Sequence, residues 1–272
     1  MQVTGNPCEG TAHEPACTPI SYAESPGEKW SAGLLDHIQT AGEHLLMKIT
    51  SVGRYGKRLT RFGVINCFLV HEDDGYTLID SNLKGSEEEI LGEAGDVPIR
   101  RVLLTHPHVD HVGSVDGLMA TINGLRLLAS ERSILILRIP PDLSLRQGEV
   151  GPIRGGTPGI KTEVTQTVAE GDQVGSLLVV DSPGHIHGHQ AFLDERDGTL
   201  YAGDAFASLG RLTITGFTPW WFPLKAFSNR SQARDTARKL QAYPIQRVAC
   251  GHGKVLEGGH ELLQGAIDRA KG

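Results

Sequence analysis

The stretch Thr105–His111, with the sequence Thr-His-Pro-His-Val-Asp-His, constrains what this chain can fold into more than any other. The run Arg100–Leu104 before it predicts a short buried strand, so the stretch begins where a strand ends. It holds four potential metal ligands: His106, His108, Asp110 and His111. The alternative is a solvated loop that is rich in histidine by chance. Ligand-type residues at this spacing after a strand favour a metal site.

The spacing of the four side chains indicates two ions. Residues two apart in a loop that leaves a strand can point to the same side, so His106 and His108 can bind one ion. Asp110 and His111, at the turn into the next helix, are then placed to bind a second. Neutral imidazole and carboxylate together suit a divalent ion such as zinc.

At these residues the chain resembles the metallo-β-lactamase fold superfamily, whose signature is His-x-His-x-Asp-His after a strand. The superfamily also needs a histidine, a bridging aspartate and a last histidine, each at a strand end. Three motifs occur in this order: Ser182–His185, Leu200–Asp204 and Arg247–Gly253. The resemblance implies that His106, His108 and His185 bind one metal ion. It implies that Asp110, His111 and His252 bind the other, with Asp204 bridging the two.

The resemblance runs from about Met47 to the C-terminus and implies an α+β fold. This fold is a four-layer αββα sandwich of two mixed β-sheets flanked by helices, with the site along one edge. Periodicity predicts strands and helices that fit this arrangement. The expected strands are Lys48–Val52, Val64–His71, Tyr76–Asp80, Arg100–Leu104, Leu125–Ala129, Thr162–Val168, Ser176–Val180, Gln190–Leu193 and Thr199–Ala202. The expected helices are Ser86–Ala94, Val112–Ile122, Ser130–Leu137, Ser228–Tyr243 and Glu257–Ala270.

The first 46 residues differ from the rest and predict a separate N-terminal extension. They are rich in Pro, Gly, Thr and Glu, which indicates partial disorder, with one short amphipathic helix from Trp30 to Leu46. The extension is either an arm that docks on the body or a partner subunit, or an upstream addition to the fold; we favour the second. Residues 47–272 then form the metallo-β-lactamase-like hydrolase domain.

Composition excludes several classes of protein. With 272 residues and 39% apolar residues, the chain can bury a proper core. A net charge of −6 without a basic block disfavours nucleic acid as a partner. Four cysteines without Cys-x-x-Cys spacing disfavour a disulfide scaffold, and Cys67 and Cys250 are expected to be buried thiols. Without an apolar run that could span a membrane, the expectation is a cytoplasmic protein with no membrane partner.

Four further features have more than one interpretation. Asp80 either braces the metal loop or caps the helix Ser86–Ala94. His187 and His189 add imidazoles that bind supporting groups, move protons or satisfy backbone carbonyls, and a structural role is favoured over direct catalysis. The Pro- and Gly-rich loop 138–162 is expected to border the site. The aromatic stretch 217–223 is a pocket wall, part of the core or an oligomer surface, and a homodimer stays open.

The resemblance and the ligand set together predict a metal-dependent hydrolase with a dinuclear zinc centre. Two divalent ions roughly 3.5–4 Å apart lower the pKa of a shared water, so a metal-bound hydroxide is the expected nucleophile. Asp110 is the candidate to orient this water and accept a proton, and Asp204 links the ions. The expected substrate is a small-molecule ester, lactone or thioester.

The sequence argues against several relatives of the same fold. The chain stops too soon after His252 for a long glyoxalase II, and Phe206 and Ala207 lie where lactonases usually carry a tyrosine. The alternative function is a mononuclear iron oxidoreductase of the persulfide dioxygenase type, which shares several ligands. A non-catalytic binding module is disfavoured because the complete ligand set is present.

Overall fold

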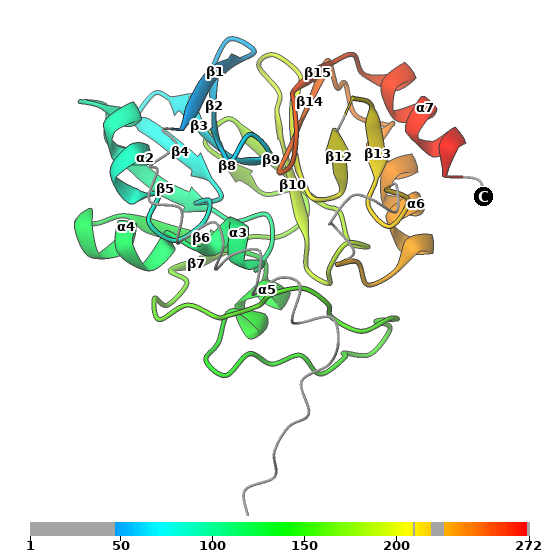
Figure 1. Ribbon diagram of the computed structural model, residues 1–272, viewed down its shortest axis with the longest axis horizontal. Coiled ribbons are helices and arrows are strands. Elements are labelled where there is room, and N and C mark those ends of the chain that lie inside the picture. Colours follow the sequence, from blue (N-terminus) through cyan, green and yellow to red (C-terminus); the bar gives the residue numbers. More distant parts are fainter. Residues whose placement is uncertain (1–46, 209, 219–225, 271–272) are drawn as a thin grey trace, which may run out of the picture. The chain divides into compact units, whose positions relative to one another are not determined.

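The described part of the protein comprises residues 47–208, 210–218 and 226–270 of a computed structural model, drawn as a ribbon in Figure 1. Contacts divide the chain into two units, Met1–Glu43 and His44–Gly272, and all described residues lie in the second. The expected extension 1–46, with its short helix, lies outside the described residues. The domain boundary at residue 47 therefore stays a prediction.

The first mixed sheet comes from the N-terminal half of the described chain. Its strands follow the order β1-β2-β3-β4-β5-β6-β7, antiparallel from β1 to β4 and parallel from β4 to β7. The strands are β1 (Lys48–Val52), β2 (Gly56–Arg61), β3 (Ile65–Glu72), β4 (Gly75–Ile79), β5 (Ile99–Leu103), β6 (Arg126–Ala129) and β7 (Gln166–Thr167). The expected strands β1, β3, β4, β5 and β6 are confirmed within one residue. The strand expected at 162–168 is shorter, and β2 carries no clear sequence signal.

The second sheet has the order β15-β14-β11-β10-β9-β8, in which only β11 and β14 run parallel among the described pairs. Its strands are β8 (Gln173–Val174), β9 (Leu177–Asp181), β10 (Gln190–Asp194), β11 (Thr199–Gly203), β14 (Arg247–Cys250) and β15 (Leu256–Glu257). The expected hairpin of β10 and β11 is confirmed. A separate small hairpin joins β12 (Phe206–Ser208) to β13 (Leu212–Ile214).

Alternating side chains along the strands divide the core into three apolar layers. On β5, Val102 packs in the cluster under the helices of the first sheet, while Leu103 packs between the two sheets. On β9, Val180 packs toward the helices of the second sheet and Val179 packs between the sheets. Successive side chains of a strand point to opposite faces, so each sheet has an apolar layer on both sides. This arrangement confirms the expected αββα sandwich.

Helices cover the outer face of each sheet. Figure 1 shows α2 and α4 on one flank and α6 and α7 on the other, with the strands between them. Their apolar residues belong to the two outer clusters of the core. The helices are α2 (Glu87–Ala94), α3 (Val109–Val112), α4 (Val115–Thr121), α5 (Glu131–Ile136), α6 (Arg230–Leu240) and α7 (His260–Arg269).

The helix expected at 112–122 is confirmed as α4 but begins three residues later, at Val115, because Gly113 and Ser114 separate it from the short helix α3. The amide of Gly113 donates to Asn82 O at 2.9 Å, and the amide of Ser114 donates to Ser81 Oγ at 3.2 Å. A Cβ at Gly113 would collide with the Lys84 backbone nitrogen. Long-range hydrogen bonds thus replace the helical ones at this point. In the described part of the chain, no helix has the length and apolar character needed to cross a membrane.

The layer between the sheets is expected to dominate stability. Phe192 is fully buried there, so Phe192→Ala should lower the free energy of unfolding by about 3–5 kcal/mol through lost burial and a cavity. Urea denaturation measures this change. Ile139→Ala, at a side chain that is 62% exposed, is the control and should change it by less than about 0.5 kcal/mol. Similar values for the two variants would contradict this account of the core.

Candidate metal centre

All seven residues singled out from the sequence converge at one edge of the sandwich. The first sheet contributes the loop after β5, and the second contributes the loops after β9, β11 and β14. Ligand-type atoms gather in three groups, within each of which they lie within 4.8 Å of one another. The groups are His106, His108 and His185; His106, His111 and Asp204; and Asp110, His111 and His252. The first and third match the two expected ion sites, and their metal-binding role stays a prediction.

Asp204 lies between the two expected ion sites. Its Oδ2 is 3.5 Å from His185 Nε2 and 3.3 Å from His252 Nε2, and its Oδ1 is 3.5 Å from His111 Nε2. The side chain is only 1% exposed. One carboxylate therefore faces imidazoles from both groups, which is the position that a bridging ligand requires.

The donor set fits a divalent metal ion. His106 Nε2, His111 Nε2 and Asp204 Oδ1 are buried and make no hydrogen bond. Buried polar atoms almost always have a partner, since leaving one unpaired costs free energy. Imidazole nitrogens and carboxylate oxygens that gather with so few hydrogen-bond partners suit a cation of the zinc type.

Asp80 supports the metal loop from behind. Its carboxylate accepts hydrogen bonds from the Thr105 amide (2.8 Å), the Thr105 hydroxyl (2.8 Å) and His111 Nδ1 (2.7 Å). The Nδ1 proton of His111 is thereby held outward, and Nε2 faces the centre. Ser86, not Asp80, occupies the N-cap position of α2. The bracing role is thus the one that the structure shows.

The two additional histidines make separate contacts with the backbone. His189 Nε2 accepts a hydrogen bond from the Asp204 amide at 3.0 Å, and its Nδ1 lies 2.8 Å from Ser182 Oγ. His187 Nε2 donates to the carbonyl of Gly151 at 2.9 Å. Both rings are buried, so the favoured structural role agrees with their placement.

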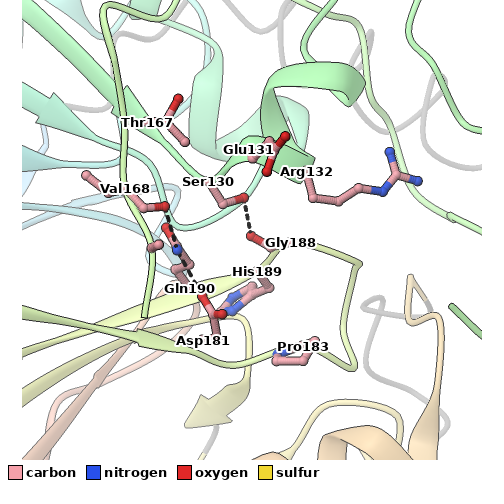
Figure 2. A pocket seen from close by; sticks show the side chains of 11 residues that line it. Ser130, Glu131, Arg132, Thr167, Val168, Asp181, Pro183, Gly188, His189 and Gln190 are labelled. Carbon is pink, nitrogen blue, oxygen red and sulfur yellow. Dashed lines mark hydrogen bonds between the residues drawn. The ribbon is translucent and has the colours of Figure 1, made fainter. Parts of the chain in front are cut away.

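The turn that carries these histidines is anchored on its other side, at a pocket of about 310 Å³ shown in Figure 2. Ser130 Oγ donates to the carbonyl of Gly188 at 2.7 Å. Gln190 Nε2 donates to Val168 O at 3.1 Å and to Asp181 Oδ1 at 2.9 Å. The dashed contacts in Figure 2 thus join the end of this turn to the residue before α5, to Val168 after β7 and to the end of β9.

The long loop 138–162 borders the centre, as expected. The carbonyl of Arg154 accepts a hydrogen bond from His108 Nε2 at 2.7 Å, which leaves Nδ1 of His108 facing His185 Nε2 at 2.9 Å. The sequence did not single out Arg154, since a backbone carbonyl has no residue signal. Asn66 was also missed, and its amide donates to the carbonyls of Cys250 and Gly253 on either side of His252.

The aromatic stretch is described only in part. Phe217 packs against the outer cluster of the second sheet, and Arg230 and Arg234 of α6 lie 5.7 and 5.6 Å from its ring centre. Residues 219–225 lie outside the described residues, so the pocket-wall interpretation stays a prediction. Cys67 and Cys250 are buried free thiols, as expected.

Two histidines of the centre favour the neutral form in the metal-free protein. Burial, reinforced by His111 and the other imidazoles, lowers the pKa of His106 well below its usual value. Burial also lowers the pKa of His185 well below its usual value, and Asp204 opposes this effect only in part. Neutral imidazole is the form that binds a metal ion.

The two histidines nearest the carboxylates behave differently. Burial lowers the pKa of His111, but Asp204, Asp80 and Asp110 outweigh it and raise the pKa to about 9. Burial is likewise outweighed at His252, where Asp204 and Asp110 raise the pKa well above its usual value. Both imidazoles therefore carry protons at pH 7 when no cation is bound.

Comparisons with known proteins agree with this geometry. The model of the Metallo-beta-lactamase superfamily matches residues 60–252. Uncharacterized protein YobT of Bacillus subtilis (strain 168) is 41% identical over 213 residues, which are 76% of this chain and 91% of that protein. A hydroxyacylglutathione hydrolase of Stenotrophomonas maltophilia (strain R551-3) is 28% identical over 196 residues. This chain spans 61% of that enzyme's length, and the match covers 71% of this chain.

A solved structure shows the same fold. The metallo-β-lactamase FIM-1 from Pseudomonas aeruginosa, in its mono-zinc form, superposes with a TM-score of 0.62 at 18% identity, over 84% of this chain and 96% of that one. The chain belongs to the metallo-β-lactamase superfamily.

Metal uptake is expected to release protons at pH 7, because a cation that binds His111 and His252 displaces the protons that their raised pKa values retain. About two protons should leave per chain, and affinity should rise with pH up to about 9. Calorimetric titration of metal-free protein with zinc, in two buffers of different protonation enthalpy, measures the number. Equal heats in both buffers would contradict the expectation.

Asp80→Asn is expected to weaken zinc binding by about 10- to 100-fold. The carboxylate of Asp80 accepts three hydrogen bonds, and in the variant an amide nitrogen, itself a donor, would face one of these donors. Competition with a chromophoric chelator measures the affinity. Asp235→Asn, on the exposed face of α6, is the control and should bind zinc like the wild type. Wild-type affinity in Asp80→Asn would show that the orientation of His111 does not depend on Asp80.

Proposed function

We propose that the protein is a metal-dependent hydrolase that uses a dinuclear centre, with zinc as the metal, to cleave a small ester, lactone or thioester. The observation that carries this proposal is the convergence of two ligand groups on the single carboxylate of Asp204. A mononuclear enzyme would need only the group of His106, His108 and His185. The second group, Asp110, His111 and His252, supports a second ion.

A relative supports the class of reaction, since it is named as a hydrolase of hydroxyacylglutathione. The proposal of zinc rests on the imidazole and carboxylate donor set. This chain spans only 61% of the length of the hydroxyacylglutathione hydrolase. We therefore propose acyl hydrolysis for this chain but do not propose glutathione as part of its substrate.

When bound, divalent ions would activate water and polarise the substrate's carbonyl oxygen. Asp110 is the residue of the set best placed to act on substrate and water, because its side chain is 20% exposed while those of His111, Asp204 and His252 are at most 5% exposed. Its Oδ2 lies 3.2 Å from His252 Nε2. We assign Asp110 the role of orienting the attacking water and accepting its proton.

The carboxylates are suited to these roles at neutral pH. Burial raises the pKa of Asp110, but His111 and His252 outweigh it and hold the pKa below its usual value. The same balance, with His252 and His111 outweighing burial, holds the pKa of Asp204 well below its usual value. Both groups are ionised at pH 7. Asp204 can thus bridge two cations, and Asp110 can accept a proton.

Substitutions of Asp204 and Asp110 distinguish the roles of the two carboxylates. Asp204→Ala should abolish turnover and lower metal content, because both ion sites lose a shared ligand. Asp110→Asn should lower kcat by at least about 100-fold through loss of the proton acceptor, and it should weaken metal binding at the group of Asp110, His111 and His252 but not at that of His106, His108 and His185. Metal analysis and hydrolysis of a panel of lactone, thioester and ester substrates measure both effects. Unchanged activity in Asp204→Ala would contradict the proposed mechanism.

The same metal analysis decides between the proposal and its alternative. About two zinc ions per chain with hydrolysis that a chelator stops would support the dinuclear hydrolase. One iron per chain with oxygen uptake and no hydrolysis would move the function to an oxidoreductase of the persulfide dioxygenase type.

A further inference from the structure

Residues 149–156 form a segment, here called the strap, that lies against both metal-binding motifs. The carbonyl of Arg154 accepts from His108 Nε2, and the carbonyl of Gly151 accepts from His187 Nε2. At the end of the strap, the carbonyl of Gly156 accepts from the amide of Val109 at 2.9 Å. A segment without helix or strand thus touches the loop after β5 and the turn after β9 at neighbouring positions.

A closed ring of contacts holds the strap in place. Arg132 of α5 binds Glu149 through two nitrogens, at 2.6 and 3.1 Å, in a charge-assisted pair. Ser130, before α5, donates to Gly188 O, as Figure 2 shows. His187 precedes Gly188 in the chain. Its imidazole donates to the carbonyl of Gly151 in the strap, and this contact completes the closed set. His187 is therefore a direct link between the strap and the turn that carries His185.

We propose that His187 is a positioning residue, which holds the strap through Gly151 so that the carbonyl of Arg154 keeps the His108 ring oriented toward the metal centre. This inference rests on the proposed metal centre and adds a residue to its support. Arg154 lies three residues after Gly151 in the chain, so a displaced Gly151 carries the Arg154 carbonyl with it. The His108 tautomer depends on that carbonyl, because donation from Nε2 leaves the lone pair on Nδ1 for the ion.

Two observations indicate that His187 positions the strap and does not only fill space in the core. His187 is 3% exposed, and its Nε2 is used as a hydrogen-bond donor. The strap also fits His108 closely, since a Cβ added to Gly155 would lie 2.6 Å from His108 Nε2. Small displacements of the strap therefore act directly on the ring.

Gly155 and Gly148 make a matched pair for testing this fit. Both have a left-handed backbone, with φ of +97° and +86°, so an alanine strains each of them similarly. A Cβ at Gly148 meets nothing within 4 Å, whereas one at Gly155 meets His108. A difference between Gly155→Ala and Gly148→Ala thus reports the contacts of the added Cβ, of which the shortest is with the His108 ring and the next with Ala226, and not backbone strain.

The test measures zinc affinity and strap release for His187→Phe, His187→Gln and the two glycine variants. Zinc affinity comes from competition with a chromophoric chelator. Strap release comes from the rate of tryptic cleavage after Arg154 in the metal-free protein, read by mass spectrometry. Thermal unfolding confirms that each variant is folded. Phenylalanine keeps the bulk of the ring but has no donor, whereas the amide of glutamine can donate to Gly151.

The proposal expects His187→Phe and Gly155→Ala to bind zinc about tenfold more weakly. His187→Phe should also be cleaved about fivefold faster, the effect of losing one hydrogen bond. His187→Gln and Gly148→Ala should stay within about threefold of the wild type in affinity. Equal zinc affinity in His187→Phe and His187→Gln would overturn the proposal, as would equal affinity in the two glycine variants.

The outcomes separate this inference from the proposed function. A wild type that binds zinc but hydrolyses nothing, with the variant pattern above, would refute the hydrolase and keep the positioning role. A wild type that hydrolyses its substrate, with variants that bind zinc like the wild type, would refute only the positioning role. A wild type that binds no zinc overturns both.

Discussion

The burial of unpaired imidazole nitrogens beside two carboxylates is the constraint on which this structure depends. Burying such atoms without hydrogen-bond partners costs free energy until a cation binds them. The rest of the fold must therefore hold the cluster together. The first sheet brings the His106–His111 stretch, and the second brings His185, Asp204 and His252. The apolar layer between the sheets joins the two halves, and within it the rings of Phe68 and Tyr201 meet edge to face at 5.1 Å.

Support for the cluster comes from groups one contact further out. Asp80 adopts a left-handed backbone with φ of 58° and places both of its oxygens against the metal loop. Asn66 holds the two carbonyls that flank His252. The strap adds a third support, at His108. The side chains of Asp80 and Asn66 and the Arg154 carbonyl thus support three different candidate ligands, His111, His252 and His108.

Several elements could not be predicted, and each has a physical reason. The strand β2 reads Gly-Lys-Arg-Leu-Thr-Arg, with little alternation of apolar residues, and it is held by full pairing with β1 and β3 on both sides. The break between α3 and α4 arises from hydrogen bonds to Ser81 and Asn82, some 30 residues away. The helix α6 begins at Arg230, two residues after the expected start at Ser228, and its N-cap is Asn229, whose side chain accepts from the Gln232 amide.

The candidate ligands and the class of fold could be predicted from the sequence, because ligand-type residues after strands and the period-two alternation are local signals. It also indicated that the loop 138–162 borders the site. Only the tertiary structure decided that Asp204 lies between the two groups, that Asp80 braces the loop, and that His187 reaches Gly151. These facts depend on contacts between residues far apart in the chain, often through backbone carbonyls, which leave no mark in the residue pattern.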